Sequence, residues 1–224
     1  MRFSGFGEHA VEFFDGLEVD NSRAYWQDNR EVYTADVRAP MEALVTELEV
    51  EFAGGFGGTG RPGTGKVFRP YRDLRFSKDK RPYKTHCGGV VEPARGAGAY
   101  YVELSSAGLR VGGGSFRMAQ DQLARYRVAV NEERRGTELA KLLDELRAAG
   151  WELGGDRMRT RPRGYPAEHP RLELLRHRTM YVAYCWPPDG VLHSRDVLDR
   201  VRGAWRQLTG LNEWTYDHVG LAAA

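Results

Sequence analysis

Basic side chains able to bind an anion are concentrated in one stretch of the sequence, residues 61–86. It contains nine lysines and arginines against two acids, a local balance of +7, whereas the whole 224-residue chain carries only +2. A guanidinium group offers five donors in a fixed fork and keeps its charge, so several that converge with lysines form an anion site. Because Asp73 and Asp79 cannot neutralise so many cations, the others need acids from elsewhere or a ligand.

The same stretch interleaves its charges with large apolar side chains, which a disordered basic tail lacks. They are Phe68, Tyr71, Leu74, Phe76 and Tyr83. The pattern therefore predicts a folded basic segment. Its candidate anion ligands are Arg69, Arg72, Arg75, Lys78, Lys80 and Lys84, and the candidate wall of the ligand pocket is formed by Trp26, Tyr71 and Tyr83.

Three further residues of the segment are expected to hold its shape. Asp73 and Asp79 are expected to pair with arginines, and Ser77 to bond backbone N–H groups in a turn over residues 77–82. An alternative makes Ser77 a nucleophile with a neighbouring lysine as its base. It is disfavoured, because adjacent residues rarely point at each other and the glycine elbow of a hydrolase serine is absent.

Two histidines are candidates for acid–base chemistry. His86 directly follows the basic segment, beside any anionic substrate bound there, and His169 has Glu168 next to it. The alternative for both is a loop histidine bonded to backbone. The six histidines show neither an HExxH motif nor a paired spacing with the two cysteines, so neither a metal site nor a cofactor is indicated.

A second candidate anion site is glycine-rich. Residues 112–115 read Gly-Gly-Gly-Ser between a predicted strand and a predicted helix, and a helix N-terminus with free N–H groups favours an anion. Arg117 and Arg125 would then assist. Neither a Walker lysine nor a dinucleotide fingerprint is present, so a tight turn or bulge at the strand end is favoured.

Hydrophobic periodicity predicts helices before and after a central group of strands. We expect a helical part over residues 8–53, a mobile glycine-rich loop over 54–65, the basic motif and sheet over 66–115, and helices with a late strand over 116–218. In the first part, one helix carries Tyr25, Trp26 and Tyr33 on a common face, and Pro40 starts the next. The fold class is therefore α+β, a single domain over residues 1–224 with a largely antiparallel sheet flanked by N-terminal and C-terminal helices.

Short alternating runs locate the expected strands. They cover residues 66–72, 85–91, 100–104, 109–111 and 179–186. No apolar run approaches the roughly 18 to 20 residues that span a bilayer, and the first residues lack the order of a signal peptide. We therefore expect a cytoplasmic protein without a membrane partner.

The run RDLRFSKDKRPYKTH resembles the signature of domain of unknown function 2461, whose pattern is R-x-x-R-D-x-R-F-S-K-D-K-x-P-Y-K. The resemblance extends to DNSRAYWQDNREVYTADVRAP, to YYVELSSAGLRVGGG and to RPRGYPAEHPRLELLR. It covers most of the chain. The resemblance implies a common fold and a common site around the motif, and it assigns no reaction.

Three hypotheses of function remain open at this point. The first is a pocket that binds or acts on a small phosphate- or carboxylate-bearing molecule. The second is a nucleic-acid-binding module in which the same cations contact successive phosphates. The third is an internal charge network without a ligand. Outside residues 61–86 the chain is acidic, which favours the first hypothesis over the second.

Overall fold

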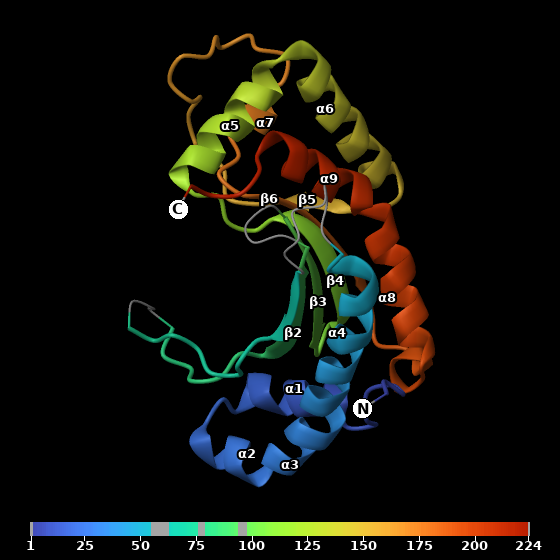
Figure 1. The fold of residues 1–224 in the computed structure, drawn as a ribbon. Helices are drawn as coiled ribbons and strands as arrows, with labels where there is room; N and C mark the ends of the chain where they lie inside the picture. The colour runs from blue at the N-terminus through green and yellow to red at the C-terminus, as the bar shows by residue number, and fades with distance from the viewer. Residues whose placement is uncertain (1, 55–62, 76–78, 94–97, 224) are drawn as a thin grey trace.

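The computed structural model describes residues 2–54, 63–75, 79–93 and 98–223 and shows one six-stranded sheet with helices around it (Figure 1). The strand order is β1-β2-β3-β4-β6-β5, and every neighbouring pair is antiparallel. The strands are β1 (Thr64–Val67), β2 (His86–Glu92), β3 (Ala99–Ser105), β4 (Gly108–Ser115), β5 (Glu152–Gly154) and β6 (Met180–Trp186). The predicted single α+β domain with an antiparallel sheet is confirmed.

Helices precede and follow the sheet. Those before it are α1 (Ala10–Val19), α2 (Arg23–Asp28), α3 (Arg30–Val32), the π-helix η1 (Tyr33–Arg38) and α4 (Ala39–Phe52). Those after it are α5 (Gln120–Asn131), α6 (Glu133–Ala148), α7 (Leu172–Leu175), the 3-10 helix η3 (Gly190–His193), α8 (Asp196–Gln207) and α9 (Thr209–His218). Within the described ranges, no helix has the length and apolarity needed to cross a membrane.

The two faces of the sheet are covered differently. Side chains alternate along a strand, so β3 directs Tyr100, Val102 and Leu104 to one face and Tyr101 and Glu103 to the other. The first three are buried. On the covered face α1 contacts β3, α4 contacts β1 and β2, and α8 and α9 contact β4. The other face is concave and opens between the helices at the two ends of the molecule (Figure 1). Any ligand of the sheet must therefore approach this open face.

Large aromatic side chains fill the covered face. The ring of Trp205 on α8 lies 5.3 Å from the rings of both Phe52 and Tyr100, and its indole N–H donates to the Tyr101 carbonyl at 3.0 Å. Buried aromatic rings contribute large apolar areas, and a buried indole needs a partner for its N–H. These contacts fix the backbone of β3, from which the open face is built.

The N-terminal helices differ from the single helix predicted through Tyr25 and Tyr33. Helix α2 ends at Asp28, because the Asn29 side chain donates to the Tyr25 carbonyl at 2.9 Å and competes with a further helical turn. The π-helix η1 then precedes Pro40, which has no N–H to offer the carbonyl of Asp36. That carbonyl accepts the N–H of Gly7 at 2.9 Å instead. A hydrogen bond thus joins the π-helix η1 to the residues that precede α1.

The prediction of a glycine-rich turn at residues 112–115 is wrong. Gly112, Gly113 and Gly114 lie inside β4, where they pair with Tyr101, Tyr100 and Ala99 of β3. An inner strand of an antiparallel sheet commits its backbone groups to both neighbours. These glycines therefore form no phosphate cradle ahead of α5.

The strand predicted over residues 66–72 is shorter and begins earlier, at Thr64. Beyond Val67 the chain leaves the sheet, and Pro70, which lacks an N–H, accepts from the Lys84 N–H at 2.8 Å. Tyr71 and Tyr83 form an isolated bridge there. The predicted mobile loop 54–65 lies mostly outside the described residues, which resume at Gly63.

Candidate functional site

Three arginines of the basic segment are paired with its own aspartates. Asp73 accepts from the side chain and the backbone N–H of Arg75, and Asp79 accepts in the same way from Arg81. Asp79 also accepts from Arg72 at 2.6 Å. The hydrogen bonds from Arg75 lower the pKa of Asp73, and those from Arg81 and Arg72 hold the pKa of Asp79 well below its usual range. Three guanidinium groups are thus occupied within the segment.

The aromatic rings expected to wall a pocket form a core cluster. Trp26 stacks on Tyr83 at 4.3 Å with an interplanar angle of 7°, and each is only 6% exposed. The backbone of Tyr83 is held from both sides by the Asn21 side chain, which accepts from its N–H and donates to its carbonyl. Only Tyr71, 52% exposed, presents its ring to solvent. The cluster therefore joins the basic segment to α2 and leaves Trp26 and Tyr83 out of reach of a ligand.

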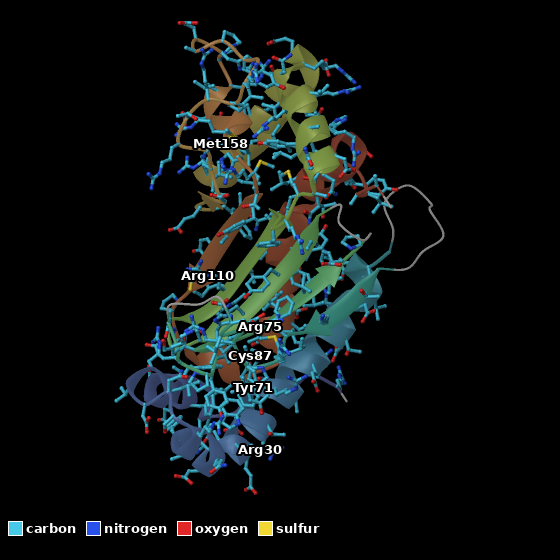
Figure 2. The ribbon with its side chains drawn as sticks, turned by 90° about the vertical axis from the view of Figure 1, so that its left-hand side faces the viewer. Arg30, Tyr71, Arg75, Cys87, Arg110 and Met158 are labelled. Atoms are coloured by element: carbon cyan, nitrogen blue, oxygen red, sulfur yellow. The ribbon has the colours of Figure 1, made fainter. Side chains whose placement is uncertain are left out.

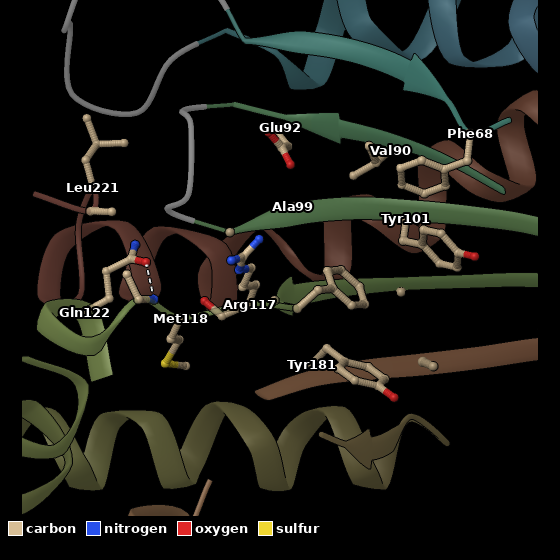
Figure 3. Close-up of a pocket in the computed structure, with 18 of the residues that line it drawn as sticks. Phe68, Val90, Glu92, Ala99, Tyr101, Arg117, Met118, Gln122, Tyr181 and Leu221 are labelled. Carbon is tan, nitrogen blue, oxygen red and sulfur yellow. Dashed lines mark hydrogen bonds between the residues drawn. The ribbon is translucent and has the colours of Figure 1, made fainter. Parts of the chain in front are cut away.

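A cavity of about 1130 Å³ lies on the open face of the sheet (Figure 3). Its aromatic lining comes from Phe68, Tyr101, Phe116 and Tyr181, and its charged lining from Glu92, Glu103, Arg110 and Arg117. Figure 3 shows the rings of Phe68, Tyr101 and Tyr181 on the same face, each from a different part of the chain. Among the described residues of the basic segment, only Phe68 contributes to this lining.

Two glycines let the tyrosines of the cavity lie flat against the sheet. A Cβ atom at Gly88 would stand 2.7 Å from the Tyr101 hydroxyl, and one at Gly154 would stand 2.6 Å from the Tyr181 ring. Contacts that short would displace both rings. The glycines of β2 and β5 therefore shape the floor of the cavity.

Three titratable groups meet at Glu103, which lines the cavity together with Tyr101. The Tyr101 hydroxyl donates to Glu103 at 2.5 Å, and the His86 Nε2 atom lies 3.8 Å from the same carboxylate oxygen. Burial, with the negative charge of Glu103, raises the pKa of Tyr101, which stays protonated as a donor. Burial lowers the pKa of His86; the charge of Glu103 opposes this shift, and the charges of Lys84 and Arg72 add to it. Burial therefore makes His86 harder to protonate, and Glu103 is the acceptor for the Tyr101 hydroxyl.

Several cations near the open face have no acidic partner among the described residues. The Lys84 ammonium lies 5.3 Å from the Phe68 ring centroid, and burial lowers its pKa. Arg110 and Arg117 line the cavity and form no salt bridge with any acid that the structure describes. Glu103 stands opposite Arg110 in the strand ladder, but its carboxylate turns to Tyr101. The charges of these three side chains are thus not neutralised by a described carboxylate.

The remaining predicted site residues lie elsewhere. Arg69 is exposed, and Lys80 donates to the Leu74 carbonyl at 3.2 Å. The His169 Nδ1 atom accepts from the backbone N–H of Arg171, away from the cavity lining. Arg125 donates to the carbonyls of Val219 and Leu221. Ser77 and Lys78 lie outside the described residues. Across the described ranges, His, Cys, Asp and Glu side chains form no group of three that would hold a metal ion.

Sequence reasoning did not assign Tyr101, Arg110 or Tyr181 to a site. The available signal was the alternation of β3, which places Tyr101 and Glu103 on one face. That signal does not show which face is open. The register with β4, which sets Arg110 opposite Glu103, appears only in the sheet.

The family model described as "Conserved hypothetical protein (DUF2461)" matches residues 9–214. Because this match covers nearly the whole chain, the protein belongs to that family, and the resemblance seen in the sequence is confirmed. No curated protein matches the chain.

Proposed function

We propose that the protein binds a small molecule with an acidic group on the open face of its sheet. The observation that carries this proposal is the pair Arg110 and Arg117, which line an aromatic cavity and have no carboxylate partner among the described residues. A cation in such a site gains most from a phosphate or carboxylate, because charge-assisted hydrogen bonds are the strongest kind.

The size and lining of the cavity indicate the rest of the ligand. Ligand pockets commonly measure about 300–1,000 Å³, and this one reaches about 1130 Å³. Phe68, Tyr101 and Tyr181 offer ring faces to a planar body, whose polar edge would meet Glu103 as an acceptor. A nucleotide-sized molecule with an aromatic part and an anionic part satisfies these features together.

The basic segment contributes to this proposal through Lys84 and, at its exposed surface, through Arg69. Lys84 stands beside Phe68 and acts electrostatically on His86, so it would draw an anion toward the end of the cavity occupied by Glu103. Binding of nucleic acid along this segment has less support, because Arg72, Arg75 and Arg81 already share two aspartates.

Binding and its dependence on Arg110 test the proposal. Thermal unfolding is measured with a panel of nucleotides, sugar phosphates and aromatic carboxylates, and any stabilising compound is titrated calorimetrically. Arg110→Gln should weaken binding of the selected ligand by about 10- to 100-fold. This corresponds to the loss of one hydrogen bond to a charged group, which contributes about 1.5–3 kcal/mol.

Arg30→Gln is the matched control, because Arg30 is exposed on α3, far from the cavity lining. It should bind the ligand as the unaltered protein does. A panel in which no compound stabilises the protein, or an Arg110→Gln variant with unchanged affinity, would reject the proposal.

A further inference from the structure

A second arginine-rich stretch, residues 156–178, lies apart from the cavity. It contains seven arginines against three acids. They are Arg157, Arg159, Arg161, Arg163, Arg171, Arg176 and Arg178. The chain runs here between β5 and α7 around the end of the molecule that carries α5 (Figure 1). Figure 2 looks onto the open face and shows Met158 of this stretch at the opposite end from Arg30.

Two of the three acids of this stretch are shared among the arginines at its base, and the third, the exposed Glu168, forms no salt bridge with a described residue. Glu173 accepts from Arg176 at 2.9 Å and lies 3.9 Å from Arg157, and Asp156 lies 3.4 Å from Arg178. The arginines at the tip have no acidic partner within the part of the chain that the structure describes. Those arginines are Arg159, Arg161 and Arg163, and all three are exposed.

Backbone contacts hold the tip in place. The Arg176 side chain donates to the carbonyls of Met158 and Arg159, both at 2.8 Å, and the Arg161 side chain donates to the Tyr165 carbonyl at 2.6 Å. Pro162, between two exposed arginines, is buried. The arginines therefore project at every second residue from an ordered support. Less side-chain and loop entropy is lost when a ligand binds to such a surface.

We propose that Arg159, Arg161 and Arg163 form a docking surface for the phosphates of single-stranded nucleic acid. Three guanidinium groups in sequence suit successive phosphates of one strand better than a single small anion. A hollow of about 430 Å³ lies among Arg161, Arg163 and Tyr165, and the half-buried Tyr165 ring offers a face for a base.

Other polyanions fit the surface less well. A duplex groove is read by a helix or a ribbon that enters it, whereas α7, the helix of this stretch, has only four residues. Anchoring to an anionic membrane requires apolar insertion besides charge. Among the described residues, the large apolar side chains exposed at the surface all lie outside residues 156–178.

Fluorescence anisotropy with labelled strands of about 16 nucleotides tests this surface at about 50 and 200 mM salt. The full chain should bind both DNA and RNA strands, with affinity that falls steeply as salt rises. The triple variant Arg159→Gln/Arg161→Gln/Arg163→Gln should bind at least about tenfold more weakly at low salt. Its slope of log affinity against log salt should be shallower by about 2, for three lost phosphate contacts.

The control triple Arg23→Gln/Arg30→Gln/Lys66→Gln removes the same charge at exposed positions elsewhere and should retain most of the affinity. Equal losses in both triples would show that only net charge matters and would reject the surface. Absence of strand binding by the unaltered protein would reject it as well. Two further results would reject the proposal. One is that the protein prefers anionic phosphatidylserine vesicles to single strands, and the other is that it prefers duplex to single strands, in each case with binding that the triple variant abolishes. Unchanged thermal unfolding of the variants establishes that they fold.

Discussion

The two arginine-rich stretches of this protein differ in where their guanidinium groups find partners. In the first, around residues 72–81, each aspartate holds the arginine two positions later through both its backbone and its side chain. In the second, around residues 157–163, the arginines at the tip have only a backbone carbonyl or no partner at all among the described residues. Positive charge counted in a sequence is therefore available to a ligand only where acids are not close enough to neutralise it.

The stretches also differ in their support. The first is attached to the core by an aromatic stack, since Tyr83 packs flat on the buried Trp26. The second is held by the guanidinium group of Arg176, which donates to two backbone carbonyls. Mutations in the first should therefore act mainly on stability, and those at the tip of the second mainly on binding.

The largest effect is expected from removing the aromatic anchor. Trp26→Ala should lower the free energy of unfolding by about 3–5 kcal/mol, the usual cost of deleting a large buried ring. Tyr71→Ala in the same cluster should cost less than half as much, because Tyr71 is half exposed. Urea denaturation measures both. A loss below about 1 kcal/mol for Trp26→Ala would show that the stack does not anchor the basic segment.

The pairing within the first stretch predicts a dependence of stability on pH. The pKa of Asp79 is lower in the folded protein than in the unfolded chain, so its contribution is present above about pH 4 and is lost as pH falls further. Asp79→Asn should therefore be less stable than the unaltered protein at pH 7 and lose less of its stability between about pH 4 and pH 2. Urea midpoints across this range measure the difference. If the urea midpoints of the variant and of the unaltered protein changed in parallel with pH, the ion pairs of Asp79 would not contribute to stability.

A smaller effect is expected at Lys84, whose charged form is destabilised by the fold, whereas the charged form of Asp79 is stabilised. Burial lowers its pKa, so the charged form is disfavoured in the fold, and stability should rise as pH increases through that lowered pKa toward about 10.4. Lys84→Met keeps the contact with Phe68 and should remove this rise. Lys80→Met, at an exposed lysine of the same segment, should leave the profile unchanged. Identical profiles for both variants would show that Lys84 is not desolvated.

Much of the fold followed from local patterns. The alternation of residues 100–104 marks β3, and the run at 85–91 marks β2, because one buried face imposes a period of two on a strand. The run of glycines at 112–114 led to the wrong prediction of a turn, because glycine favours turns where only its local sequence is considered. Inside β4 the same residues are held by two neighbouring strands, which override the local preference.

The candidate site was predicted in part. The sequence shows the density of charge in the basic segment. It also shows that each aspartate there stands two residues before an arginine, because both features involve residues that are neighbours along the chain. Trp26 and Tyr83 were expected to face a ligand, yet they face each other, because their stacking depends on how α2 packs against the segment. An aromatic residue buried in a core and one that lines a pocket give the same sequence pattern, so the sequence does not distinguish them.

By itself the sequence determined the family, the α+β class and the location of the positive charge, all of which depend on residue types and on neighbours along the chain. Only the tertiary structure decided which charges remain available and which face of the sheet is open. Tyr101, Arg110 and Tyr181 share a cavity because the register of separate strands brings them together. Register results from the packing of the whole sheet against its helices, and no single stretch of the chain specifies it.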